Sequence, residues 1–159
     1  MNIAVGNAVE PEEILRDLLG LDRGLGRERY WGEDSLFYNP GRVAPLGVIF
    51  ASIKDHDGAN DRSAELSRAG VYRLAFCLAP ATYARLFGDV PARPPKGGIV
   101  DLAEYHPTRL NELMPHPVYA WMRWVQILAP TPADLDALRP LLNESLELVR
   151  AKWKRRKAG

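Results

Sequence analysis

Met114-Pro-His-Pro-Val-Tyr-Ala-Trp-Met-Arg-Trp-Val-Gln-Ile-Leu-Ala-Pro130 is the stretch that decides the fold, together with the helical pattern that follows it. Within this stretch, the apolar run over residues 121–128 predicts a buried strand. The next residues favour a helix start: Thr131 suits the N-cap, Pro132 the first helical position and Asp134 a capping box. We therefore expect a strand that passes through one tight turn into the longest helix of the chain.

The predicted C-terminal helix places six apolar side chains on one face. They are Leu135, Leu138, Leu142, Leu146, Val149 and Trp153. Pro140 lies inside this pattern. A proline has no backbone N–H and clashes with the preceding turn, which costs about 3 kcal/mol inside a regular helix. We therefore expect a kink or a break of the helix at Pro140.

Helical spacing and alternating apolar patterns predict the elements upstream. They are helices at residues 11–19 and 80–87 and strands at residues 35–38, 47–54 and 71–78. Residues 22–29 hold two glycines among charged residues and predict a loop. No crossover helix separates the three strands, so we expect them to run antiparallel. The sequence thus predicts a two-layer α+β domain, with the N- and C-terminal helices on one face of an antiparallel sheet of about four to five strands.

Length and composition are those of one globular domain spanning residues 1–159. The chain has 159 residues, of which 47% are apolar and 26% charged, with a formal net charge of +1. Its single cysteine, Cys77, excludes an intrachain disulfide framework and fits a reducing compartment. The start of the chain has no secretory pattern, and no apolar run is long enough to cross a bilayer. We therefore expect a soluble, cytoplasmic protein, a monomer or homodimer, without membrane contact.

Two segments depart from this ordinary pattern. Residues 89–113 contain four prolines and no sustained period, so we expect a long loop that is either a lid or an insertion. The tail, residues 150–159, carries six basic residues and no acidic one. The sequence favours the interpretation that these basic residues stabilise the C-terminal end of a helix. Each cation there interacts with the negative end of the helix dipole and contributes roughly 0.3–1 kcal/mol. Binding of nucleic acid by this tail is the alternative.

His116 stands out among single side chains. Two prolines flank it, and their fixed φ angles hold the backbone extended and aim the imidazole. With Tyr119 nearby, the imidazole could bind a ligand or act as a general acid or base. No partner close in sequence is expected to orient His116. A lone histidine more often caps a helix or packs in the core than binds a ligand.

A second group of candidates lies where predicted strands end. Lys54 and Asp55 close one strand and Arg73 lies in the next, so the three could converge on an anion. An ion pair between the strands explains the same residues without a ligand. The predicted ligand site is Trp31, Lys54, Asp55, Arg73, His116 and Tyr119.

The loop at residues 55–61 is the densest group of potential metal ligands. Its glycine is in the fourth position, whereas an EF-hand loop needs glycine in the sixth. Asp, Asn and Gly are also the residues of tight polar turns, and a turn is the favoured interpretation. Cys77 is expected to be a packed residue of its strand. No nucleophile-elbow, Cys-x-x-Cys, zinc-protease or phosphate-loop pattern occurs, so we predict no catalytic residue, metal or cofactor.

At this point the chain resembles the MmcQ/YjbR-like proteins, a bacterial group of unknown molecular function. The residues that carry the resemblance are Val71-Tyr72-Arg73-Leu74, Trp124-Val125-Gln126-Ile127-Leu128, Leu138, Leu142, Ser145, Leu148-Val149 and Lys152. The chain is similar more closely to a smaller family of unknown function related to that group, through Trp31-Gly32-Glu33, Phe37-Tyr38, Lys54-Asp55, Arg68 and His116-Pro117-Val118-Tyr119. The resemblance implies a YjbR-like α+β fold, a double-wing arrangement suggested to bind DNA. The long 89–113 segment and the excess of acidic residues outside the basic tail differ from that group. Both features argue against DNA binding.

Three functional hypotheses follow. The first is a non-catalytic binding or interaction module with a small polar pocket, which takes a small molecule or a protein partner. The second is a small-molecule-binding protein or enzyme that uses His116 as acid or base beside Asp55 or Arg73. The third is nucleic-acid binding through the basic tail. Because no nucleophile–base or metal-ligand spacing occurs, the sequence favours the first.

Overall fold

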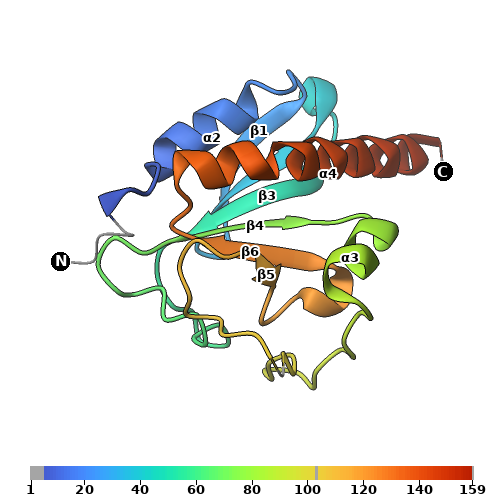
Figure 1. Cartoon of the computed structure of the whole chain (residues 1–159). Helices are drawn as coiled ribbons and strands as arrows, with labels where there is room; N and C mark the ends of the chain where they lie inside the picture. The colour runs from blue at the N-terminus through green and yellow to red at the C-terminus, as the bar shows by residue number, and fades with distance from the viewer. Residues whose placement is uncertain (1–5, 103, 159) are drawn as a thin grey trace.

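Antiparallel pairing of six strands builds a single sheet in the order β1-β2-β3-β4-β6-β5 (Figure 1). The computed structural model describes residues 6–102 and 104–158. The strands are β1 (Leu25–Tyr30), β2 (Glu33–Tyr38), β3 (Val48–Lys54), β4 (Arg73–Cys77), β5 (Met114–Pro115) and β6 (Trp124–Leu128). The helices are α2 (Pro11–Leu19), α3 (Pro80–Phe87) and α4 (Pro132–Ala158), with 3-10 turns η1 (Pro40–Arg42) and η2 (Ala120–Met122). The predicted α+β class is confirmed, and the sheet is larger than the four to five strands expected.

Local sequence signals explain where the helices begin. Pro11 occupies the first turn of α2, and the acidic residues Glu12 and Glu13 follow it. At the start of α4, the Thr131 N–H donates to the Asp134 carboxylate at 2.9 Å, and the Asp134 N–H donates to Thr131 Oγ1 at 3.1 Å. This reciprocal pair is the predicted capping box, and it satisfies two backbone donors that a helix start leaves free.

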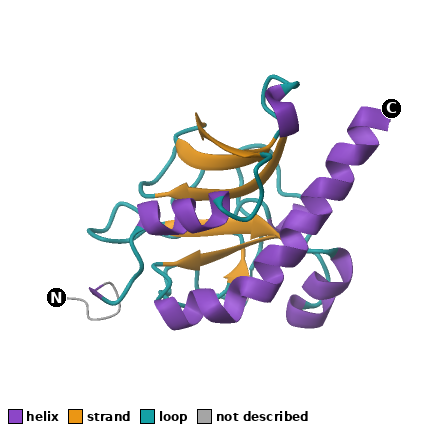
Figure 2. Ribbon diagram, turned by 90° about the horizontal axis from the view of Figure 1, so that it is seen from above, coloured by secondary structure: helices purple, strands orange, loops and turns teal. Residues whose placement is uncertain are grey.

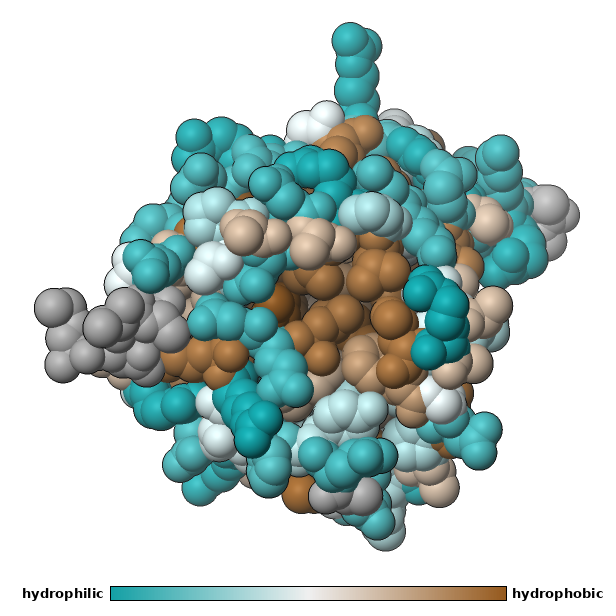
Figure 3. Space-filling view, in the orientation of Figure 1, coloured by the Kyte–Doolittle hydropathy of each residue, from teal (hydrophilic) through white to brown (hydrophobic). Residues whose placement is uncertain are grey.

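α2 and α4 lie on the same face of the sheet, and α4 runs diagonally across it (Figures 1 and 2). The buried side chains between these layers form one apolar core. Its helical members are Ile14, Leu15, Leu18, Leu138, Leu142, Leu146, Val149 and Trp153, and its sheet members include Leu36, Phe50, Ile53, Leu74, Phe76, Val125 and Ile127. Each large side chain buried in this way stabilises the fold by roughly 1.5–3 kcal/mol. Figure 3 shows further apolar residues gathered in a hollow below α4 and beside α3 on this side of the molecule.

Pro140 does not break α4, which continues from Pro132 to Ala158. The predicted break is therefore wrong. Pro140 lies on the exposed side of the helix, so the carbonyl that loses its hydrogen-bond donor faces solvent. Five buried core residues on the other side of the same helix outweigh the local cost.

Residues 22–29 were predicted as loop, but most of them form the edge strand β1. Charged residues in β1 hide the apolar–polar alternation that is typical of a strand. Arg27 and Arg29 lie on the helix-bearing side, where Arg27 pairs with Glu12 at 2.7 Å and Arg29 pairs with Asp34 at 3.2 Å. Charged side chains of this kind are common on edge strands, where they discourage pairing with other chains.

The strand predicted at residues 121–128 begins three residues later than expected. Trp121 belongs to the turn η2, and Arg123 follows with a positive φ of 66° that no regular strand tolerates. Trp121 and Trp124 therefore do not lie in one strand. The short strand β5, which pairs with β6, is too brief to produce a periodic signal in the sequence.

The second face of the sheet carries no helix among the described residues and is covered in part by loops. Residues 89–102 and 104–113 contain neither helix nor strand and are tied down along their length. The Val100 N–H donates to the Pro117 carbonyl, the Gln126 side chain donates to the Pro107 carbonyl, and the Asn111 N–H donates to the Leu128 carbonyl. This loop and residues 55–71 bury the middle of the second face, where the candidate site lies.

Candidate functional site

Two neighbouring strands supply a buried charge cluster on the second face. Lys54 of β3 and Arg73 of β4 are direct partners in the sheet register, so their side chains lie next to each other. Both bind Asp61 from the loop above. Arg73 donates through Nη1 at 3.0 Å and Nη2 at 2.5 Å to the two carboxylate oxygens, and Lys54 Nζ donates at 3.0 Å to the second. We call these three residues the charge cluster.

All three side chains of the charge cluster are buried. Arg73 is 1% exposed, Lys54 7% and Asp61 8%. Burial by itself raises the pKa of Asp61, but the hydrogen bonds and charge of Arg73, helped by Lys54, outweigh burial and hold that pKa far below its ordinary value. Asp61 is therefore a carboxylate at every physiological pH, and the bidentate Arg73 pair has the geometry of a strong ion pair.

His116 lies beside this cluster and is almost fully buried. Its Nδ1 accepts hydrogen bonds from the backbone N–H groups of Val118 at 3.0 Å and Tyr119 at 3.2 Å. Burial first, and then the positive charge of Arg73, lowers the pKa of His116 well below its ordinary value. The ring is therefore neutral, and because Nδ1 is an acceptor, its hydrogen resides on Nε2. Nε2 has no hydrogen-bond partner within residues 6–102 and 104–158.

A hollow of about 350 Å³ opens above His116 on the second face. We call it the aromatic pocket. It is lined by Tyr30, Trp31, Glu33, Ser35, Ile49, Ser52, His116, Tyr119, Met122, Trp124 and Lys152. Four of these residues are aromatic rings of Tyr or Trp, and the volume is at the lower end of the range that small-molecule sites occupy. The pocket draws on β1, β2, β3, β6, η2 and α4.

Trp31 holds a strained position at the rim of the aromatic pocket. Tyr30 and Glu33 are paired in the register, so only Trp31 and Gly32 connect β1 to β2. Both have positive φ, 55° and 75°, the pattern of a type I′ turn, which favours Asn-Gly. A non-glycine residue in this conformation costs about 1–2 kcal/mol. Trp31 is nevertheless 80% exposed, so burial of its indole does not offset the strain.

The walls of the aromatic pocket combine donors and one acceptor. Glu33 accepts a hydrogen bond from the Ser52 hydroxyl at 3.0 Å. Burial, with smaller contributions from Glu33 and Asp61, raises the pKa of Tyr119, so its phenol stays protonated and available as a donor. Lys152 of α4 adds an exposed ammonium group. The site can thus hold a planar ring between aromatic side chains and bind its polar groups from below.

The structure brings five of the six predicted site residues to one region and excludes the sixth. Trp31, His116 and Tyr119 line the aromatic pocket, and Lys54 and Arg73 lie beneath it in the charge cluster. The Asp55 side chain is 68% exposed and pairs with His56 at 3.0 Å instead. The predicted convergence of Lys54 and Arg73 is correct, but the carboxylate they share belongs to Asp61.

Sequence reasoning missed Asp61 because a loop, and no regular element, delivers it. The acidic loop at residues 55–61 was the signal that could have found it. Asp57 in this loop accepts from the Leu66 N–H at 2.8 Å, and a bridge joins Gly58 to Asp61. The loop acids thus have structural partners, and no group of three or more His, Cys, Asp or Glu residues in the described chain is placed to hold a metal ion.

His116 also differs from the sequence interpretation. No partner close in sequence was expected to orient it, yet the backbone N–H groups two and three residues later do so. The Cys77 thiol is half-buried, and burial raises its pKa, which agrees with the expectation of a packed residue.

The basic tail is partly engaged in the fold. Arg150 donates to the Asp22 carboxylate through Nε at 2.9 Å and Nη2 at 2.6 Å, and Arg156 donates to the Gly47 carbonyl at 3.2 Å. In the described part of the chain, no helix combines the length and apolar character needed to cross a membrane.

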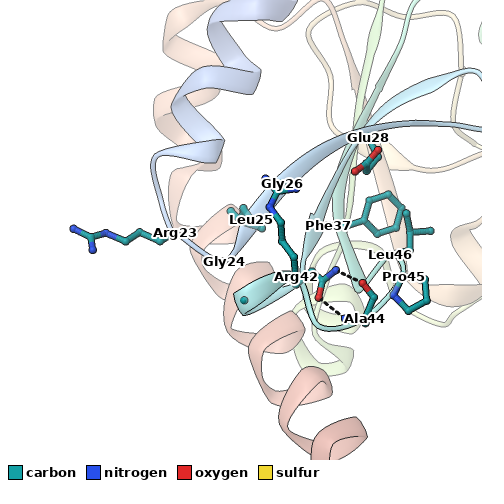
Figure 4. Close-up of a pocket in the computed structure, with 12 residues that line it drawn as sticks. Arg23, Gly24, Leu25, Gly26, Glu28, Phe37, Arg42, Ala44, Pro45 and Leu46 are labelled. Atoms are coloured by element: carbon teal, nitrogen blue, oxygen red, sulfur yellow. Dashed lines mark hydrogen bonds between the residues drawn. The ribbon is translucent and has the colours of Figure 1, made fainter.

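A second hollow, of about 450 Å³, lies at the other end of β1 and β2 (Figure 4). Its charged residues are exposed, and Arg23 points away from it. The side chain of Asn39 is already bonded to the Ala44 backbone at 2.7 and 3.1 Å. Arg42 in this hollow also has a positive φ, 53°, but compared with the aromatic pocket the hollow presents no buried histidine and no Tyr or Trp ring, so we assign the candidate site to the aromatic pocket.

Comparison with known proteins places the chain in a family. The sequence profile described as "Family of unknown function (DUF6194)" matches residues 9–158. No curated protein matches the chain, and no solved structure matches it. The matched residues run from the segment before α2 to the end of α4 and so contain the whole sheet and the aromatic pocket. The chain therefore belongs to the DUF6194 family of unknown function.

Proposed function

We propose that this protein is a non-catalytic binding protein whose aromatic pocket takes a small planar molecule. The observation that carries the proposal is Trp31, an exposed indole kept in a strained turn at the rim of a hollow. Strained backbone of this kind clusters at active sites and ligand clamps. Exposed aromatic side chains that gather around one hollow are typical of ligand sites. The rings of Tyr30, Trp31, Tyr119 and Trp124 provide faces against which a planar ligand can stack.

The hydrogen-bonding state of His116 supports binding over catalysis. A general base must present an unprotonated nitrogen to the substrate. In His116 the unprotonated nitrogen is Nδ1, and the two backbone N–H groups occupy it. A neutral imidazole is also a very weak acid, so its Nε2–H serves as a hydrogen-bond donor and not as a proton source. Acid–base chemistry at His116 is therefore the less favoured function.

Two further parts of the proposal rest on the sequence. We infer that the family is a relative of the MmcQ/YjbR-like proteins, which the strand and long helix at the C-terminus support. This relationship concerns the fold and carries no function with it. We also infer a cytoplasmic location, because the thiol of Cys77 suits a reducing compartment.

The four tryptophans of the chain allow a direct test. Trp31 and Trp124 line the aromatic pocket, Trp153 lies in the core under α4, and Trp121 stacks beneath Arg93 outside the pocket. In 15N–1H NMR spectra, each indole N–H gives its own signal. On titration with mono- and bicyclic aromatic compounds, we expect the Trp31 and Trp124 signals to move and the Trp153 signal to stay.

A Trp31→Asn variant should bind the same compounds at least about fivefold more weakly, because stacking at a ligand site is worth about 1–3 kcal/mol. The matched control is Ile99→Asn, which changes another exposed apolar residue outside the pocket. If no compound moves the Trp31 and Trp124 signals, or if both variants bind equally well, the aromatic pocket is not the functional site.

A further inference from the structure

The charge cluster leaves a positive charge unbalanced beneath the aromatic pocket. Lys54 and Arg73 are both basic, and the single carboxylate of Asp61 pairs with both. All three side chains are buried, so water screens the remaining charge less than it would at the surface. His116 lies in the field of this cluster, since Arg73, Asp61 and Lys54 all act on its ring.

His116 offers a hydrogen-bond donor within this field. The ring is neutral, its Nδ1 is occupied by backbone donors, and its Nε2–H is the remaining polar group. A donor in a positive field favours an acceptor that carries negative charge, because both the hydrogen bond and the charge attraction then act on the same atom.

The charged side chains of the pocket wall do not reverse this preference. Glu33 is the single acid among the lining residues, and Lys152 is the single lysine or arginine. The Glu33 carboxylate already accepts a hydrogen bond from Ser52 at 3.0 Å. These two charges offset each other to a first approximation, so the cluster beneath decides the sign of the field at His116.

We propose that the aromatic pocket selects planar aromatic molecules that carry a carboxylate, and that this carboxylate accepts the hydrogen bond from His116 Nε2. The ring stacks against the aromatic residues of the rim, and the charge cluster favours the anion from below. This inference rests on the proposed function, which would hold equally for a neutral or cationic ring.

Three probes that share one ring separate the two proposals. They are 2-naphthoate, naphthalene-2-carboxamide and 2-naphthylmethylammonium, and their dissociation constants are measured by NMR titration of the full chain at pH 7. We expect 2-naphthoate to bind about threefold tighter than the carboxamide and about tenfold tighter than the ammonium compound.

Two variants then test the source of the preference in opposite directions. Lys54→Met removes the unbalanced charge but keeps the Arg73–Asp61 pair, so the preference for naphthoate over the ammonium compound should fall about tenfold. Glu33→Gln removes the negative charge of the wall and keeps an acceptor for Ser52, so the same preference should rise. The indole N–H spectrum of each variant shows whether it is folded.

The possible results are distinct. If the ammonium compound binds as tightly as naphthoate or tighter, the charge preference is wrong while the proposed function stands. If neither variant changes the preference for naphthoate, the proposed role of the charge cluster is also wrong, because exposed Lys152 would then be the source of the preference. If none of the three probes binds, the proposed function fails and this inference fails with it.

Discussion

The two faces of the sheet are built on different physical principles. On the face beneath α2 and α4, the buried residues are apolar except for Ser145 of α4, and burial of apolar area stabilises the contact. On the opposite face, the buried residues include Lys54, Asp61, Arg73 and His116. Buried charges destabilise a fold unless each is paired, and here the pairing is specific in direction and distance.

This difference separates stability from function. The apolar face could exchange one aliphatic residue for another of similar volume at little cost. The polar face could be replaced by apolar residues without loss of stability, and often with a gain. Under the proposed function, this cluster serves as a preorganised floor for the ligand. Mutations on the two faces should consequently behave in different ways.

Loss of Asp61 should have the largest effect. Asp61→Asn leaves Lys54 and Arg73 buried without a counter-charge, and breaking a buried pair in this way costs about 3–5 kcal/mol. We expect a matching fall in the free energy of unfolding, measured by urea denaturation. Asp55→Asn is the control, since the Asp55 side chain is exposed and should change stability by less than about 0.5 kcal/mol. Equal effects of the two substitutions would contradict the importance of the cluster.

A core substitution tests whether the faces are independent. Leu15 of α2 is 1% exposed in the apolar core, and Leu15→Ala should lower the free energy of unfolding by about 3 kcal/mol. Because Leu15 lies on the face opposite the aromatic pocket, the folded protein should keep its affinity for 2-naphthoate. A parallel loss of affinity would show that the pocket depends on packing across the sheet, and the comparison of the two faces would fail.

The pH dependence of stability should report His116. Its folded pKa is lowered, so below its ordinary pKa near 6.5 the unfolded chain binds a proton that the folded chain does not. Stability from this source is complete above that pH and decreases as pH falls. Between pH 7 and pH 5, we expect a loss of up to about 2 kcal/mol in the wild type.

His116→Gln should remove most of this loss, because glutamine does not titrate. The measurement is the urea midpoint at pH 7, 6 and 5 for both proteins. Ile99→Asn is the control: it changes an exposed residue that does not titrate, so it should leave the slope unchanged. Identical slopes in wild type and His116→Gln would mean that His116 is not held neutral by the fold.

The sequence predicted those features that depend on neighbours in the chain. The α4 capping box needs Thr131 and Asp134 at fixed spacing, and apolar periodicity marks α2 and the central strands. β1 was missed because its charged residues obscure the alternation that only pairing with β2 makes visible. Asp61 was missed for a similar reason: its partnership with Arg73 depends on the path of a loop through space, which no local pattern encodes.

The pocket shows the same division. Trp31, His116 and Tyr119 could be selected from the sequence. Trp31 belongs to the Trp31-Gly32-Glu33 motif of the family resemblance, and His116 lies between two prolines with Tyr119 nearby. Lys152 could not, because its place in the pocket depends on how α4 crosses the sheet. Pro140 was expected to kink or break that helix, and the break does not occur because tertiary packing on the buried side of α4 outweighs a local preference.

Trp31 gives the smallest expected change in stability and the sharpest contrast between the faces. Asparagine is the preferred residue at the first position of a type I′ turn, so Trp31→Asn should relieve strain and raise the free energy of unfolding by about 1 kcal/mol. The same variant should lose affinity for 2-naphthoate. Substitutions in the apolar core are not expected to increase stability and abolish binding together. Urea denaturation of this one variant measures the change in stability, and NMR titration measures the change in affinity. If the variant is less stable than the wild type, or binds as tightly, the strained turn has no role in the site.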